Sequence, residues 1–198
     1  MNTINLFSTP IYKVQYPGNT AKILDSINDI ILNLDNINNQ SNMRGNGYCS
    51  YNTKKDLHTL PQLQELVTWI NEQATIYWQE IGYDKNKQPG VYEMWTNVYK
   101  QDSYIELHNH SPIHMTASFY LQLPNNGGNL IFENPLSTLL KHQPYDLDSI
   151  RYTNIFEHET VVNTGDLVIF PGYLSHKTIP NSSNKDRIIL GANVCNVI

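Results

Sequence analysis

The stretch YIELHNHSP, residues 104–112, places His108 and His110 two positions apart in a segment with the composition of a short strand. Residues two apart on a strand point to the same face, so both imidazoles could approach one metal ion together. A third histidine, His176, follows in LVIFPGYLSHKTIPN (167–181), where a Pro-Gly bend ends an apolar strand. Three such histidines would form one triangular coordination face and leave the opposite face open. The pattern predicts a metal site in a β-rich fold.

The spacing also permits other interpretations of these histidines. An H-x-H step recurs by chance, and the three side chains could be strand and loop histidines that share no target. Glu106 would lie on the same strand face as the histidines, so Glu106, His108 and His176 form an alternative ligand set. The remaining histidines are interpreted as ordinary: His58, His114, His142 and His158.

Length and charge limit the possible scaffolds and partners. A chain of 198 residues suits one β-sandwich or barrel with a substantial core. The net charge is -5, from 13 Lys and Arg against 18 Asp and Glu, and no basic run occurs in the sequence. Strong nucleic-acid binding is therefore not expected.

The N-terminus and the cysteines indicate a cytoplasmic protein. The sequence MNTINLFSTPIYKV has neither a basic region nor a long apolar segment, and no stretch approaches membrane-spanning length. Cys49 and Cys195 lack CxxC spacing, so neither a disulfide framework nor a thiolate metal site is indicated. We expect no membrane association and two reduced thiols.

The hydrophobic period separates a helical cover from a β-rich body. AKILDSINDIILNL (21–34) and LPQLQELVTWINEQATIYWQEIGY (60–83) have apolar residues at helical spacing, with Pro61 suited to a first turn and Gly82 to a stop. From Gly90 onward, strand-like stretches alternate with turns such as NNGG, NTGD and NSSNKD. The expected strands are VYEMWTNVYK (91–100), YIELHNH (104–110), HMTASFYLQLP (114–124), NLIFENP (129–135), ETVVN (159–163), DLVIFPG (166–172) and RIILGANVCNVI (187–198).

Many short strands without intervening helices favour a sandwich, barrel or jelly roll over a parallel α/β sheet. The expected fold is mainly β with flanking N-terminal helices. We expect one domain over residues 1–198, with a helical cover and an N-terminal strand in 1–89 and a jelly-roll core in 90–198. The segment 135–159 is expected to be an irregular insertion, and loops of this length often form lids or substrate-binding elements.

Several segments of the C-terminal half resemble, in the same order, the 2-oxoglutarate/Fe(II)-dependent oxygenase family that is common in phage and marine bacterial genomes. They are MWTNVYKQDSYIELHNHSPIHMTASFYLQLP, GNLIFENP, GDLVIFPGYLSHKTIPN and DRIILGANV, and they run from about Trp95 to Val194. The opening LFSTPIYKV (6–14) also resembles the start of that family. Ordered agreement of several pieces is more specific than the H-x-H step alone.

The resemblance implies a double-stranded β-helix, a cupin-like jelly roll, that holds Fe(II). His108, His110 and His176 are the implied ligands, because the related family carries H-x-H where most non-haem iron oxygenases carry H-x-D/E. On this match His110 is preferred to Glu106. Three neutral imidazoles leave the charge of the dication uncompensated, which favours an anionic co-ligand such as 2-oxoglutarate, although they could also accept Zn(II) or Ni(II).

The resemblance also implies residues for 2-oxoglutarate. Arg187, eleven positions after His176, matches the basic residue that holds the distal carboxylate. A guanidinium fork suits a carboxylate through two parallel charge-assisted hydrogen bonds. Without the resemblance, Arg187 would be interpreted as a surface arginine at a strand start. Tyr120 and Asn97 are further candidates for this pocket, although tyrosine and asparagine on strands often only pack.

The implied activity is that of a 2-oxoglutarate- and Fe(II)-dependent dioxygenase that hydroxylates a peptidyl side chain or a small metabolite. Two alternatives stay open. One is a cupin-like metalloprotein that does not use 2-oxoglutarate, and the other is a non-catalytic jelly-roll protein of a virion or a binding module. The sequence identifies neither the substrate nor the oligomeric state. A phage-encoded protein would act in the host cytoplasm.

Overall fold

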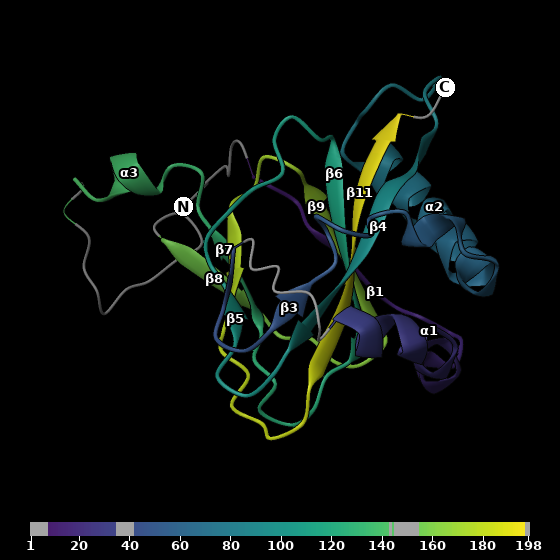
Figure 1. Cartoon of the computed structure of the whole chain (residues 1–198). Helices are drawn as coiled ribbons and strands as arrows, with labels where there is room; N and C mark the ends of the chain where they lie inside the picture. Colours follow the sequence, from purple (N-terminus) through teal and green to yellow (C-terminus); the bar gives the residue numbers. More distant parts are fainter. Residues whose placement is uncertain (1–7, 35–41, 143, 145–154, 197–198) are drawn as a thin grey trace.

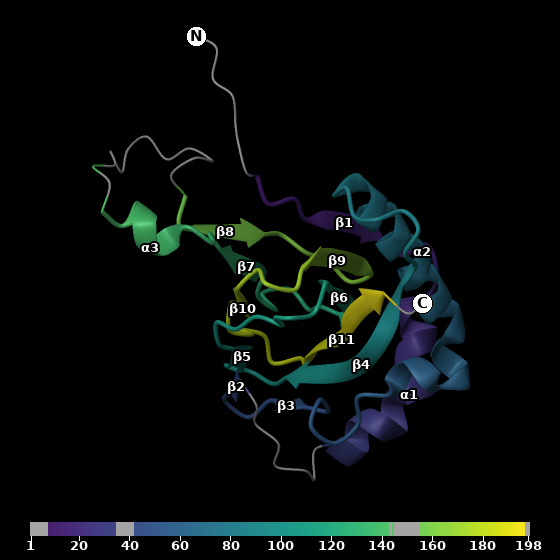
Figure 2. The ribbon, with the colours of Figure 1, turned by 90° about the horizontal axis from the view of Figure 1, so that it is seen from above.

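The computed structural model describes residues 8–34, 42–142, 144 and 155–196, which form layers of strands covered by helices. Every strand pair is antiparallel. The main sheet has the order β1 (Tyr12–Gln15), β9 (Asp166–Pro171), β6 (Met115–Gln122), β11 (Arg187–Asn196), β4 (Pro89–Tyr99), β3 (Tyr48–Cys49). Opposite it (Figures 1 and 2) lie a sheet of β10 (His176–Thr178), β7 (Leu130–Glu133) and β8 (Glu157–Thr160), and a pair of β2 (Met43–Arg44) and β5 (Tyr104–Ile105).

Two helices from the N-terminal part cover the outer face of the main sheet, as Figure 2 shows. Helix α1 (Thr20–Leu34) and helix α2 (Gln64–Glu80) confirm the helices expected from the apolar spacing. In α1, Ile27 is fully buried whereas Leu32 is 59% exposed, as expected for an amphipathic helix. None of the described helices is long and apolar enough to cross a membrane.

The residues that border α2 explain where it begins and ends. Pro61 opens a 3-10 turn, η2 (Pro61–Leu63), that leads into α2, because proline fixes a helical φ and needs no hydrogen bond there. A similar turn, η1 (Leu57–Thr59), precedes it. Beyond α2, Gly82 has a φ of +77°, a conformation that favours glycine and ends the helix.

Alternation along β4 and β11 separates two cores. Val98 and Ile188 are cross-strand partners that pack under the helices. Trp95 and Ile189 point to the opposite face, toward the smaller sheets. Because β4, β6, β9 and β11 are buried on both faces, most of their positions are apolar, and polar side chains on the inner face are candidates for function.

Two sequence expectations need correction. The H-x-H segment is not a regular strand, because β5 ends at Ile105 and the strand-like pairing of His108 is an isolated bridge to His176. The insertion expected at 135–159 contains a short helix, α3 (Ser137–Leu140), and the start of β8; residues 143 and 145–154 lie outside the described part.

The packing of α1 generates a stability prediction. Ile27→Ala should lower the free energy of unfolding by about 2–5 kcal/mol, because it leaves a cavity between α1 and the main sheet. Leu32→Ala on the exposed face of the same helix should change it by less than about 0.5 kcal/mol. Urea unfolding of both variants measures the difference. Equal losses would show that α1 does not pack on the sheet through Ile27.

Candidate metal centre

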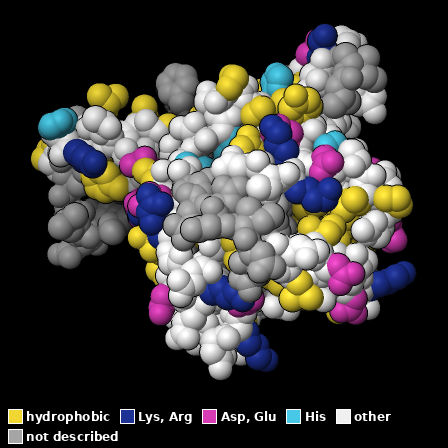
Figure 3. Space-filling view, in the orientation of Figure 1, with side chains coloured by type: hydrophobic (Ala, Val, Ile, Leu, Met, Phe, Trp, Pro, Cys, Tyr) yellow, Lys and Arg dark blue, Asp and Glu magenta, His cyan; other side chains and the backbone are white. Residues whose placement is uncertain are grey.

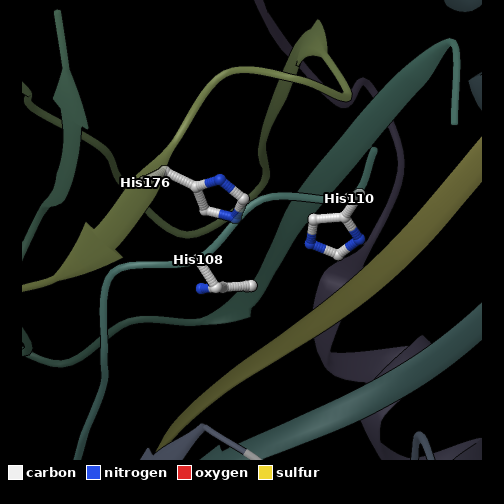
Figure 4. A group of neighbouring side chains, drawn as sticks. All are labelled: His108, His110 and His176. Atoms are coloured by element: carbon white, nitrogen blue, oxygen red, sulfur yellow. The ribbon is translucent and has the colours of Figure 1, made fainter. Parts of the chain in front are cut away.

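His108, His110 and His176 converge on one point (Figure 4), and their candidate ligand nitrogens all lie within 4.8 Å of one another. Backbone hydrogen bonds bring them together. The amide of His108 donates to the carbonyl of His176 at 3.1 Å, and the amide of His176 donates back at 2.9 Å. The amide of His110 donates to the carbonyl of Gly172 at 2.7 Å, which ties the second histidine to the Pro-Gly bend.

Hydrogen bonds at the outer nitrogens fix the orientation of the three rings. Nδ1 of His108 lies 2.8 Å from the carbonyl oxygen of Glu106, and Nδ1 of His176 lies 3.0 Å from that of Leu174. Nδ1 of His110 lies 2.9 Å from the side-chain oxygen Oδ1 of Asn193. Oxygen atoms of this kind only accept, so each Nδ1 carries the proton and each Nε2 presents a lone pair.

The environment keeps all three imidazoles neutral near pH 7. Burial lowers the pKa of His108, with hydrogen bonding at the backbone opposing it. Burial and the neighbouring His108 lower the pKa of His110 to about 4. Burial and the other two rings lower the pKa of His176 well below its usual value. Neutral imidazole is the form that ligates a metal ion.

Aromatic side chains pack around the rings and limit their movement. Trp95 stacks on His110 with ring centroids 5.7 Å apart and planes at 19°. Phe170 contacts His176 edge to face at 4.6 Å. Gly191 lies under Trp95, where a Cβ atom would be 2.6 Å from the indole, so only glycine lets the indole take this position.

The alternative ligand Glu106 lies outside the cluster. Its carboxylate pairs with Nη2 of Arg44 at 2.6 Å, and its side chain is 44% exposed. The strand rule placed Glu106 beside His108, but the chain leaves regular strand geometry after Ile105. Among the described residues, the only cluster suited to a metal ion is the one formed by the three histidines.

The histidines face a cavity of about 490 Å³ between the main sheet and the smaller sheets. Tyr120 and Asn97, both predicted from sequence, line this cavity. The hydroxyl of Tyr120 and Oδ1 of Asn97 are buried and have no hydrogen-bond partner among the described residues. Burial raises the pKa of Tyr120, so its hydroxyl stays protonated and can donate.

Arg187 is fully buried beside the same cavity. It does not itself line the cavity among the described residues, but its Nη2 donates at 2.9 Å to the hydroxyl of Thr178, which does. Its Nη1 donates to the carbonyls of Gly127 and Ile179 at 2.6 and 2.9 Å. Nε has no partner in the described chain.

The guanidinium of Arg187 is a buried positive charge without a neighbouring carboxylate in the described chain. Its carbon lies 3.9 Å from the ring centroid of Tyr99, a cation-π contact. Burial lowers the pKa of Arg187, and Tyr99 and Tyr120 oppose this effect. Arginine nevertheless remains protonated in proteins, so this end of the cavity is suited to an anion.

Sequence reasoning missed Thr178, Asn193 and Glu93. Asn193 lies six positions after Arg187, and this even spacing places both on the inner face of β11, a signal available in the sequence. Glu93 is buried although its neighbour Tyr92 in β4 is 58% exposed. Burial raises the pKa of Glu93, but hydrogen bonds from Lys55 and Asn193 outweigh burial and lower it overall.

The fold and the cavity define a jelly-roll protein with a candidate metal centre and a buried arginine next to it. A family model described as "Putative 2OG-Fe(II) oxygenase" matches residues 93–193, just over half of the chain, and the chain belongs to this family. Membership assigns it to the 2-oxoglutarate- and Fe(II)-dependent oxygenases, as the sequence resemblance implied. No curated protein matches the chain.

Solved structures share the fold along nearly the whole chain. A prolyl-4-hydroxylase from Pseudomonas putida is 13% identical, with a TM-score of 0.60 over 95% of this chain and 94% of that one. HygX from Streptomyces hygroscopicus, with nickel and 2-oxoglutarate bound, is 13% identical, with a TM-score of 0.63 over 96% and 84%. AviO1 from Streptomyces viridochromogenes Tue57 is 11% identical, with 0.64 over 96% and 90%. These likenesses confirm the expected double-stranded β-helix.

The lowered pKa of His110 generates a prediction for metal-free protein. The free energy of unfolding should fall as the pH is lowered from about 6.5 toward 4, because the unfolded chain binds this proton first. Urea unfolding of wild type and His110→Gln is compared at about pH 7 and about pH 4.5. The difference between the two proteins isolates the contribution of His110, since the carboxylates and the other histidines titrate in both. A wild type that loses no more stability on acidification than the variant would contradict the burial of His110.

Proposed function

We propose that the chain is a dioxygenase that holds Fe(II) through His108, His110 and His176 and binds 2-oxoglutarate in the adjoining cavity. One observation supports this most strongly. The cavity has three convergent neutral imidazoles at one place and the uncompensated charge of Arg187 beside its wall. A dication and a guanidinium together suit a dianion with two separated carboxylates.

The described side chains fit both groups. Nε2 of each histidine is available, and three protein ligands leave coordination positions for 2-oxoglutarate and dioxygen. Arg187 would hold the distal carboxylate through Nε, which lacks a partner, and the hydroxyl of Tyr120 would donate to the same group. Asn97, whose Oδ1 also lacks a partner, is a further candidate for orienting a molecule in the cavity.

When bound, iron and 2-oxoglutarate supply an oxidant from dioxygen, with 2-oxoglutarate decarboxylated to succinate and a hydroxyl transferred to substrate. The chain's contribution is to bind, orient and shield the reactants. Trp95 and Phe170 hold two ligand rings in place, and Ile189 and Leu130 keep the adjoining cavity wall apolar. Excluding water in this way limits side reactions of a strong oxidant.

The cavity favours an uncharged substrate group, either a peptidyl side chain or a small metabolite. Among the described residues that line it, Glu93 is the only charged one, and Glu93 is already paired with Lys55. The other polar lining residues are amides, hydroxyls and rings, including Asn52, Asn109 and Ser111. Among the fold relatives, one is named a prolyl-4-hydroxylase, and HygX has been solved with hygromycin B bound.

The proposal also includes the cellular location of the protein and its lack of strong nucleic-acid binding. We propose a cytoplasmic protein, in the host cytoplasm if it is phage-encoded, because Cys49 and Cys195 form no disulfide and Fe(II) needs a reducing compartment. Acidic and basic side chains are interspersed on the face seen in Figure 3, an arrangement that provides no continuous basic surface for nucleic acid there.

An anaerobic titration with Fe(II) and then 2-oxoglutarate tests the proposal. A weak visible charge-transfer band should form in wild type and be lost in His176→Ala. Arg187→Met should raise the apparent Kd for 2-oxoglutarate about 10–100-fold, since a charge-assisted pair contributes about 1.5–3 kcal/mol.

Glu106→Gln serves as the matched control, because its carboxylate faces Arg44 outside the cluster. Its band should match that of wild type. If iron binds but 2-oxoglutarate produces no band, the cupin-like alternative is favoured, since three histidines without a carboxylate also suit that class. If no metal binds, the non-catalytic jelly roll is favoured.

A further inference from the structure

His110 is held differently from the other two histidines. The outer nitrogens of His108 and His176 bond to backbone carbonyls, whose position is set by the chain path. The outer nitrogen of His110 bonds to the side chain of Asn193. A side chain that bonds a ligand ring influences the orientation and basicity of that ring, and its own partners influence it in turn. His110 is therefore the ring whose properties depend on other side chains.

A continuous line of polar contacts leads from His110 to the surface. Nδ2 of Asn193 donates to Oε2 of Glu93 at 3.0 Å, and Oε1 of Glu93 pairs with Nζ of Lys55. Asn193 is 2% exposed and Glu93 is 8% exposed, whereas the Lys55 side chain is half exposed. The line therefore runs from a buried amide through a buried carboxylate to a solvated ammonium.

The order of donors and acceptors gives this line one direction. The carboxylate of Glu93 only accepts, so the Asn193 amide must turn its nitrogen toward Glu93. Its oxygen then faces His110 and accepts from Nδ1, which leaves Nε2 of His110 unprotonated. Glu93 thus selects the ligating tautomer of a ring that it does not touch.

Sheet register brings the pair together. Asn193 of β11 and Glu93 of β4 are direct cross-strand partners, and the register shifts immediately after Asn193. Cross-strand partners present side chains on the same face about 5 Å apart, within reach of a hydrogen bond. The position next to a bulge is a common place for a strand to aim a functional side chain.

A second line of contacts supports the same ring. Trp95 stacks on the face of His110, and Tyr51 packs edge to face on Trp95 at 4.9 Å. The ammonium of Lys55 lies 5.4 Å from the ring centroid of Tyr51. Both lines that begin at His110, one at its edge and one at its face, end at Lys55.

We propose that Asn193 and Glu93 are positioning residues that give the metal centre an outer carboxylate in place of the missing carboxylate ligand. The negative charge of Glu93 reaches His110 through the amide of Asn193, which makes Nε2 a stronger donor and orients the ring toward the other two. This inference rests on the proposed function, because it concerns how the three histidines hold a metal ion.

Co(II) binding to full-length protein, without 2-oxoglutarate or substrate, tests the inference. Affinity is measured by competition with a chromophoric chelator, and the visible d-d spectrum reports the geometry of the bound ion. Glu93→Gln, which keeps the shape and removes the charge, should weaken Co(II) binding about tenfold and shift the d-d bands. Asn193→Leu, which also removes the hydrogen bond, should weaken it by up to about 100-fold.

Asp166→Asn is the matched control. Asp166 is also a buried carboxylate paired with a lysine, Lys13, but its hydrogen-bond and ion-pair partners in the described chain do not include the histidines. Its Co(II) affinity should stay within about twofold of wild type and its spectrum unchanged. Circular dichroism and urea unfolding test whether each variant folds. If Asn193→Leu does not fold, the Co(II) affinity and spectrum of Glu93→Gln alone decide the outcome.

The outcomes separate this inference from the function beneath it. If wild type binds Co(II) and both Glu93→Gln and Asn193→Leu match it in affinity and spectrum, Asn193 and Glu93 only stabilise the fold and the inference is wrong. If Asp166→Asn weakens binding as much as Glu93→Gln, the effect is general electrostatics and the inference also fails. If wild type itself binds no Co(II), the metal centre is refuted.

Discussion

Strand β11 carries the constraint on which the site depends, because both of its faces are buried and each face has a different neighbour. Ile188 and Leu190 must meet the core under the helices, which fixes the register of β11 between β4 and β6. The side chains at the alternate positions of β11 must then point to the inner face of the sheet. Gly191 and Asn193 must face the cavity, and Arg187 must lie on the same inner face of β11 beside it, since a one-residue slip would exchange the two faces completely. The helix packing thereby positions the chemistry.

Electrostatics explains why this cavity is suited to an anion. Hydrogen bonds from Arg187 to carbonyls and to Thr178, together with the ring of Tyr99, stabilise the guanidinium but leave its charge unneutralised. Each such contact contributes about 0.5–3 kcal/mol, whereas burying an unpaired ion costs several kcal/mol. The three imidazoles are neutral and supply no counter-charge. A dianion would satisfy the guanidinium and a bound dication together.

The sequence predicted the elements whose signal is periodic and missed the features that depend on register or irregular backbone. The helices and long strands followed from apolar spacing. Tyr120 was a candidate from the family resemblance and Asn97 from its face of a predicted strand, and both line the cavity. The strand rule could not separate His110 from Glu106, because it assumes regular geometry that ends at Ile105. The pairing of Asn193 with Glu93 spans a hundred residues and depends on a cross-strand register that no local pattern encodes.

A ligand set without a carboxylate has a consequence that extends beyond the three histidines. A carboxylate bound directly to the metal would cancel part of its charge and compete with 2-oxoglutarate for it, whereas Glu93 acts from behind two neutral groups. In the proposed centre, its influence would reach the metal as a more basic imidazole, so the ion would keep its attraction for an anionic co-ligand. Lys55 then moderates Glu93 from the surface. Moving the carboxylate outward is therefore compatible with strong binding of 2-oxoglutarate, and it would make the charge at the proposed centre adjustable through residues that do not ligate the metal ion.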